Sequence, residues 1–210
     1  MSVLHTFSIL SGEGDFKIVL YVGNEKENGG LNMQVRGPLM VEHRLIERML
    51  KLVKKDLTKI AEQQTVNPVF VDTVVDFIHT YADRTHHGKE EDILFRVLKK
   101  KNISDGDRLM MNKLIEEHIF GRKITGELIK ANTCYKGGDK SSLSTIAVKL
   151  IALVDFYPKH IESEDKLFFP LLQKYLSNED EQAMLDEFWE FDRKMIHEKY
   201  ERLIQELTTD

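Results

Sequence analysis

From Gly37 onward the chain consists of long helical segments joined by short connections. The connections are Asn67-Pro68, the turn at 102–107, the KGGD at 136–139 and Ser177-Asn178, residue types that begin or end helices. The pattern predicts helices over 38–63, 68–101, 108–134, 142–176 and about 178–207. Because helices of this length joined by few residues run antiparallel to their neighbours, we predict an all-α, up-down-up-down four-helix bundle within residues 37–210, with the fifth helix as an addition.

Residues 1–36 differ in composition from the rest. FKIVLYV at 16–22 and LNMQV at 31–35 are rich in β-forming residues, and they flank the turn-forming GNEKENGG at 23–30. This pattern indicates a short N-terminal extension. A β-hairpin and a loose extension both fit it.

Charge and composition exclude several classes of protein. The 30 Lys and Arg against 35 Asp and Glu give a formal net charge of -5, so we expect no nucleic-acid partner. No apolar run approaches the roughly 20 residues that span a bilayer, and the N-terminus lacks the features of a signal peptide, so we expect a cytoplasmic protein without membrane association. The single cysteine, Cys134, rules out an intramolecular disulfide and a thiolate zinc site.

The helical region contains an internal repeat. When 87–95 is laid over 160–168, five of nine positions match: the His, the Glu four residues later, the Asp after it and a Leu-Phe pair. A Glu-His pair precedes each segment, at 42–43 and at 117–118, so the His-to-His separations are 44 and 42 residues. The chain therefore repeats a two-helix unit with one His on its first helix and His-x-x-x-Glu on its second.

This repeat predicts a metal site. His and Glu four residues apart project from one face of a helix, so two such units can direct four imidazoles and two carboxylates to the middle of one bundle. Imidazole and carboxylate donors without thiolate suit iron or manganese rather than structural zinc, and a carboxylate can bridge two ions. The candidate ligands are His43, His87, Glu91, His118, His160 and Glu164.

A second register competes with this one, because His86 and Glu90 have the same spacing as His87 and Glu91. Only Glu91 is followed by Leu and Phe three and four residues later, as Glu164 is. We therefore place His86 outside the direct ligands or at the surface.

The ordered motifs resemble the hemerythrin-like, HHE cation-binding family. They are E-H-x-x-x-E at 42–47, H-H-x-x-E-E-x-x-L-F at 86–95, E-H at 117–118 and H-I-x-x-E-D-x-L-F-F-P at 160–170, within about residues 38 to 176. The resemblance implies a four-helix bundle with a non-haem di-iron centre, that is, two iron ions with an oxo or hydroxo bridge, in preference to manganese or zinc. It also implies, by motif, the six ligands named above. Family members bind oxygen, sense oxygen, iron or redox state, or handle nitric oxide and peroxide.

The third helix departs from the pattern of the oxygen carriers, which have two histidines four residues apart there. The positions four residues either side of His118 are Leu114 and Arg122, so one imidazole is missing. Glu47, one turn after His43, is a candidate replacement, and an ion pair with Arg48, Lys51 or a neighbouring helix is its other interpretation. His197 on the fifth helix is a further candidate, although the apolar residues around it favour packing.

The fourth helix departs from the carriers as well. Carriers have an Asp five residues after the fourth-helix His, and Asp165 occupies that spacing from His160. The repeat favours Glu164 as the ligand instead.

These features predict a metal-binding, non-haem di-iron protein that binds or reacts with oxygen, peroxide or nitric oxide in a sensing or redox role. The altered ligand set makes reversible oxygen carriage the weaker expectation. Two alternatives stay open: an iron or oxygen sensor that acts through a protein partner, and a structural bundle without metal chemistry. No motif names a substrate, an enzyme class or a protein partner, and the Glu-x-x-His spacing of ferritin-like oxidases is absent from the sequence.

Overall fold

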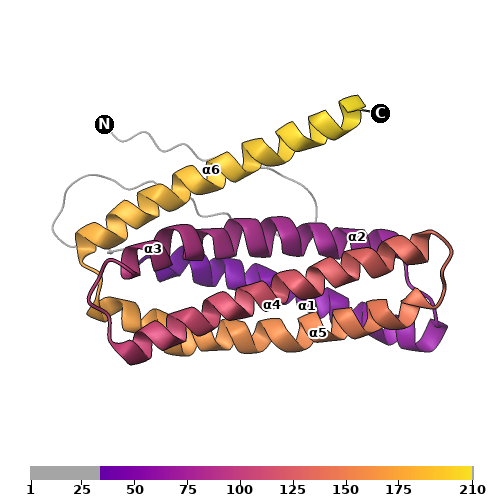
Figure 1. The fold of residues 1–210 in the computed structure, drawn as a ribbon, viewed down its shortest axis with the longest axis horizontal. Helices are drawn as coiled ribbons and strands as arrows, with labels where there is room; N and C mark the ends of the chain where they lie inside the picture. Colours follow the sequence, from indigo (N-terminus) through magenta and orange to yellow (C-terminus); the bar gives the residue numbers. More distant parts are fainter. Residues whose placement is uncertain (1–33, 210) are drawn as a thin grey trace, which may run out of the picture. The chain divides into compact units, whose positions relative to one another are not determined.

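The computed structural model describes residues 34–209, and these residues form helices without a strand. The elements are α1 (Arg36–Gln63), α2 (Pro68–Asp76), η1 (Phe77–His87), η2 (Glu90–Leu94), α3 (Phe95–Leu98), α4 (Asp105–Lys136), α5 (Ser142–Ser163), η3 (Glu164–Phe168), η4 (Phe169–Lys174) and α6 (Asn178–Thr209), as Figure 1 shows. The all-helical prediction is confirmed. The predicted hairpin lies outside the described residues, apart from the last two residues of its second strand. No helix in residues 34–209 is long and apolar enough to cross a membrane.

Four long helical segments form the bundle. The second is continuous from α2 through η1 and η2 to α3, and the fourth continues from α5 through η3 to η4. α5 packs against both α4 and α1, and α2 packs against α4, so the segments enclose a common interior (Figure 1).

The helix ends follow from local residue chemistry. The Asn67 side chain accepts a hydrogen bond from the Val69 N–H, and Pro68 occupies the first turn of α2. Ser104 accepts from the Asp107 N–H at the start of α4. Gln64, with φ 53°, ends α1 in the left-handed conformation that stops a helix.

Wide helical turns occur where the repeated His and Glu residues lie. η1, η2 and η3 have π-helical geometry, in which backbone hydrogen bonds span five residues rather than four. The Thr85 hydroxyl likewise donates to the Thr80 carbonyl, five residues earlier. Because a wide turn changes the angle between successive side chains, adjacent residues here can both face the interior. His86 and His87 are both buried.

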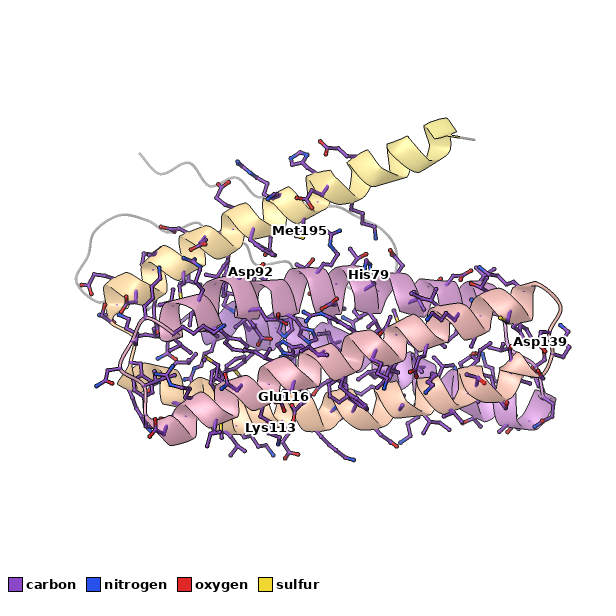
Figure 2. All side chains as sticks on the ribbon, viewed as in Figure 1. His79, Asp92, Lys113, Glu116, Asp139 and Met195 are labelled. Carbon is purple, nitrogen blue, oxygen red and sulfur yellow. The ribbon has the colours of Figure 1, made fainter. Side chains whose placement is uncertain are left out.

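The core consists of two apolar clusters with a polar layer between them. On α1, Leu39 belongs to one cluster and Ile46 to the other, and His43 lies between them in sequence. On α4, Leu114 and Ile124 flank His118 in the same way. Figure 2 shows side chains filling the space between the helices along the bundle. Apolar packing therefore borders the polar layer on both sides.

The last helix, α6, lies along η1 and η2 (Figure 1). Many of its contacts are ion pairs: Arg96 with Glu187 at 2.5 Å, Arg84 with Glu198 at 2.8 Å, and Asp76 with Lys199 at 2.8 Å. Among the described side chains of α6, the buried apolar residues are Met184, Leu185 and Phe188.

Leu128→Ala is expected to lower the free energy of unfolding by about 2–5 kcal/mol, because Leu128 is fully buried in one apolar cluster and its truncation leaves a cavity. Its neighbour Ile129 is 42% exposed, so Ile129→Ala is the control and should stay within about 0.5 kcal/mol of the parent. Urea denaturation followed by circular dichroism measures both. Equal losses would contradict the described orientation of α4.

Candidate metal centre

Seven buried side chains meet in the polar layer. They form two groups, in each of which one nitrogen or oxygen atom per residue lies within 4.8 Å of those of the others. The first group is His87, His118 and His160, and the second is His43, His86, Glu90 and Glu164. Each of the seven residues is at most 2% exposed.

Four of the five histidines are held by a carboxylate on their outer nitrogen. The Nδ1 atoms lie 2.7–2.8 Å from a carboxylate oxygen, in the pairs His43–Asp165, His86–Glu42, His118–Glu91 and His160–Glu117. A carboxylate at Nδ1 fixes the proton there and leaves Nε2 with a free lone pair, which is the arrangement found around metal-bound histidines.

His87 is the exception. Its Nδ1 lies 3.6 Å from Asp83, beyond hydrogen-bond distance. Its ring stacks on that of His118, with centroids 3.9 Å apart and planes 8° from parallel. His87 is therefore positioned by packing more than by hydrogen bonding.

The two carboxylates of the site each contact histidines of both groups. Glu164 Oε2 lies 3.2 Å from His43 Nε2, and its Oε1 lies 3.3 Å from His160 Nε2. Glu90 Oε2 lies 3.7 Å from His86 Nε2 and 3.4 Å from His118 Nε2. Two donors bound at right angles to one ion, at about 2.1 Å each, would be about 3 Å apart, so these separations fit donors that share a cation.

The inward-facing atoms have no hydrogen-bond partner. This holds for Nε2 of all five histidines and for both oxygens of Glu90 and Glu164. Each buried polar atom without a partner costs about 1–3 kcal/mol, and more when it is charged. A pair of divalent cations satisfies such a set, and its nitrogen and oxygen donors without thiolate suit iron or manganese.

The pKa values of the histidines in the site shift in different directions. Burial opposes protonation of His43, but the hydrogen bond to Asp165 and the nearby negative charge of Glu164 outweigh it and raise the pKa of His43 to about 9. At His86 burial prevails over the carboxylate of Glu42 and lowers the pKa to about 4. Burial also holds the pKa of His87 well below its ordinary value, with His118 and His160 adding to the effect. His86 and His87 are thus kept neutral, which is the form that binds a metal.

The pKa values of the two carboxylates, Glu90 and Glu164, shift in opposite directions. Burial, followed by repulsion from Glu164, raises the pKa of Glu90 well above its ordinary value. Burial opposes ionisation of Glu164 as well, but the surrounding histidines, His160 foremost, outweigh it and hold its pKa well below the ordinary value. The site therefore carries one ionised and one strongly disfavoured carboxylate until a cation is added.

The structure brings together five of the six ligands proposed from sequence: His43, His87, His118, His160 and Glu164. The sixth, Glu91, does not join them. Its carboxylate accepts hydrogen bonds from His118 Nδ1 and from Arg122 Nη2, at 2.7 and 2.6 Å, and Glu90 lies in the group instead.

The register of the repeat is corrected by one residue. Glu42 holds His86 as Glu117 holds His160, and His118 contacts Glu91 as His43 contacts Asp165. His86 is therefore the counterpart of His160. Its predicted placement at the surface is wrong, because it is 1% exposed and lies in the four-residue group. In this alignment Glu90-Glu91 matches Glu164-Asp165, and Phe95 matches Phe169. These matches are visible in the sequence, but the Leu-Phe pair favours the other register there.

His87 has Ile161 as its counterpart in the corrected register, so it adds a fifth imidazole to the layer. The buried layer thus contains five imidazoles, one more than the four predicted. The missed signal is the His-His dipeptide itself, because in a wide helical turn both residues can face inward.

The remaining candidates lie outside the two groups. Glu47 forms an ion pair, as one interpretation predicted, but its partner at 3.4 Å is Arg44 on the same helix. His197 is exposed on α6. Asp165 is close to the site, but it holds His43 Nδ1 and the Arg44 guanidinium rather than facing inward.

The fold and the site define a helical bundle with a buried histidine and carboxylate cluster suited to binding metal. The chain matches the model of the family described as Hemerythrin HHE cation binding domain over residues 38–172, more than half of its length, and belongs to that family.

Two mycobacterial proteins are similar to the chain at low sequence identity. The uncharacterized protein Mb2018 of Mycobacterium bovis and the uncharacterized protein Rv1995 of Mycobacterium tuberculosis are each 24% identical over 152 residues, which is 71% of this chain. The match covers 58% of the length of each relative. No solved structure matches the chain.

In the metal-free protein, Glu90→Gln is expected to raise the free energy of unfolding at pH 7 by about 1 kcal/mol or more. The raised pKa of Glu90 means that folding disfavours its charged form above pH 4.5, and Gln is neutral. Glu91→Gln should have the opposite sign and lose about 1 kcal/mol, because His118 and Arg122 hold that carboxylate ionised. Urea denaturation with a chelator present measures both, and a destabilising Glu90→Gln would contradict the unpartnered carboxylate.

Proposed function

We propose that this chain is a non-haem di-iron protein whose centre binds or reacts with oxygen, peroxide or nitric oxide in a sensing or redox role. The observation that carries the proposal is the pair of carboxylates, Glu90 and Glu164, each in contact with histidines of both groups. A single ion would leave part of this set without a partner. We also infer the up-down-up-down order of the four long segments, from their short connections and from the family.

The residues divide naturally between two ions. His87, His118 and His160 would hold one, and His43 and His86 would hold the other. The two carboxylates, which contact histidines of both groups, would supply oxygen donors. When bound, iron supplies a reversible change of charge and an affinity for small oxygen and nitrogen oxide ligands.

The chain's own residues prepare the site for such ligands. The carboxylates at Nδ1 orient the imidazoles and make them better donors, and the apolar clusters on either side keep bulk water out. Phe169 stacks on His43, with centroids 5.7 Å apart and planes 9° from parallel. These contacts hold the donors in one arrangement before a ligand arrives.

A small cavity lies beside the three-histidine group. It has a volume of about 110 Å³ and is lined in part by His87, Gly121, Thr125 and Tyr157. Burial keeps the pKa of Tyr157 above its usual range, so its hydroxyl stays protonated and able to donate a hydrogen bond. A cavity of this size suits a diatomic molecule or peroxide and is too small for an ordinary metabolite.

A sensing role is favoured by the contacts between α6 and the helical segment that carries His86 and Glu90. A change at the centre can then reach a helix on the outside of the bundle and through it a protein partner. The alternative of a structural bundle without metal chemistry leaves the unpartnered polar atoms of the site unexplained.

Protein prepared anaerobically with iron(II) is expected to contain two iron ions per chain and to change its near-ultraviolet absorption on exposure to air. His86→Ala and Glu90→Ala should each lower the iron content, whereas Glu47→Ala, which alters only an ion pair, should not. Metal analysis and optical titration provide the measurements, with manganese and zinc offered in competition. One zinc ion per chain and no iron would contradict the proposal.

A further inference from the structure

A buried lysine, Lys89, adjoins the centre and takes no part in the ligand set. Its side chain is fully buried, between Gly88 and Glu90 on the helical segment that carries His86. Two carboxylates contact its ammonium group: Glu42 on α1 by a short hydrogen bond, and Asp192 on α6 at 2.8 Å. The Phe188 ring, also on α6, lies 5.6 Å from the ammonium nitrogen.

The contact with Glu42 connects Lys89 to the centre. One Glu42 oxygen accepts from Lys89, and the other lies 2.8 Å from His86 Nδ1. A continuous path of side chains therefore runs from Asp192 on α6 through Lys89 and Glu42 to His86.

The second half of the repeat lacks this path. There Glu117 holds His160 Nδ1 at 2.8 Å and forms an ion pair with Lys113, at 3.4 Å on the same helix and 67% exposed. Figure 2 shows Lys113 and Glu116 on the outer side of α4. The two halves of the centre thus have similar inner residues but different surroundings, because only one is connected to α6.

The burial of Glu42 determines how the loss of the Lys89 contact would affect His86. The Glu42 side chain is 12% exposed, so without the ammonium group its carboxylate would be largely buried with one of its two hydrogen-bond partners missing. It would then turn toward solvent, and His86 Nδ1 would lose its acceptor. Glu117, at 23% exposure, keeps contact with water and does not need Lys113.

Packing brings α6 close enough to reach Lys89. A Cβ atom on Gly88 would lie 2.7 Å from the Phe191 ring, so the absence of a side chain there lets α6 approach the ligand-bearing segment. Phe188 and Asp192, on either side of Phe191 in sequence, then enclose the ammonium group.

We propose that Lys89 is a positioning residue that makes α6 part of the centre: docked α6 holds Lys89, Lys89 holds Glu42, and Glu42 orients His86. Release of α6 then weakens the metal position of His43 and His86 and leaves that of His87, His118 and His160 unchanged. The inference rests on the proposed two-ion centre and adds its regulation by α6.

Stepwise iron(II) binding to the full chain, followed anaerobically, tests this. Lys89→Met and Asp192→Asn are expected to weaken one of the two binding steps, by about 10- to 100-fold for Lys89→Met, and to leave the other within about twofold of the parent. Lys113→Met is the matched control and should leave both steps unchanged. A general loss of stability would move both steps together.

Hydrogen exchange of the backbone amides gives a second readout. Binding of iron(II) should slow exchange in residues 181–192 of the parent protein, because linkage is reciprocal, and should not slow it in Lys89→Met. Should Lys89→Met fail to fold, Asp192→Asn serves for both measurements, since its side chain is 36% exposed and nearly unchanged in shape.

The two possible failures can be told apart. A parent chain that binds two ions, together with variants that bind both ions as tightly as the parent, would overturn the role of Lys89 and leave the proposed function standing. A parent chain that binds fewer than two ions would overturn the proposed function, and the role of Lys89 with it.

Discussion

This structure depends on one constraint: a buried layer of five imidazoles and two carboxylates. The inward-facing atoms of these groups have no hydrogen-bond partner. Such a layer opposes folding, because each buried polar atom has given up water. The remaining architecture offsets that cost: apolar clusters on both sides supply burial, and outer carboxylates hold four of the five Nδ1 atoms. A bound cation pair would supply the missing inward partners and turn an unfavourable layer into a stabilising one.

The two halves of the bundle repeat most of their buried donors but differ in their surroundings. Glu42 and Glu117 play the same part in the two halves, yet Glu42 is enclosed by Lys89 and α6, whereas Glu117 contacts water and an exposed lysine. His87 adds an imidazole to one half only. Two ions in such a site would differ in affinity and in their response to the rest of the chain, which suits a sensing or redox role better than simple storage.

The sequence alone predicts the helices to within a few residues, because Asn67-Pro68, the turn at 102–107 and the glycines after α4 mark their ends. It also predicts where the site lies, since the repeated His and Glu residues occur at helical spacing. It does not predict that His86 joins His87 in the site, or that Glu90 faces inward instead of Glu91. The wide turns of η1 and η2 shift the side-chain angle, so His86 and Glu90 enter the site and Glu91 turns to Arg122. The contact of Lys89 with Asp192 joins two segments far apart in sequence, so no local pattern predicts it.

The most direct test of the account is anomalous diffraction at the iron edge from crystals of the iron-loaded protein, because it locates the ions relative to named residues. Two peaks per chain are expected: one surrounded by His87, His118 and His160, the other by His43 and His86, with Glu90 and Glu164 between them. A single peak, or peaks at Glu91 or Glu47 with the buried layer empty, would contradict it.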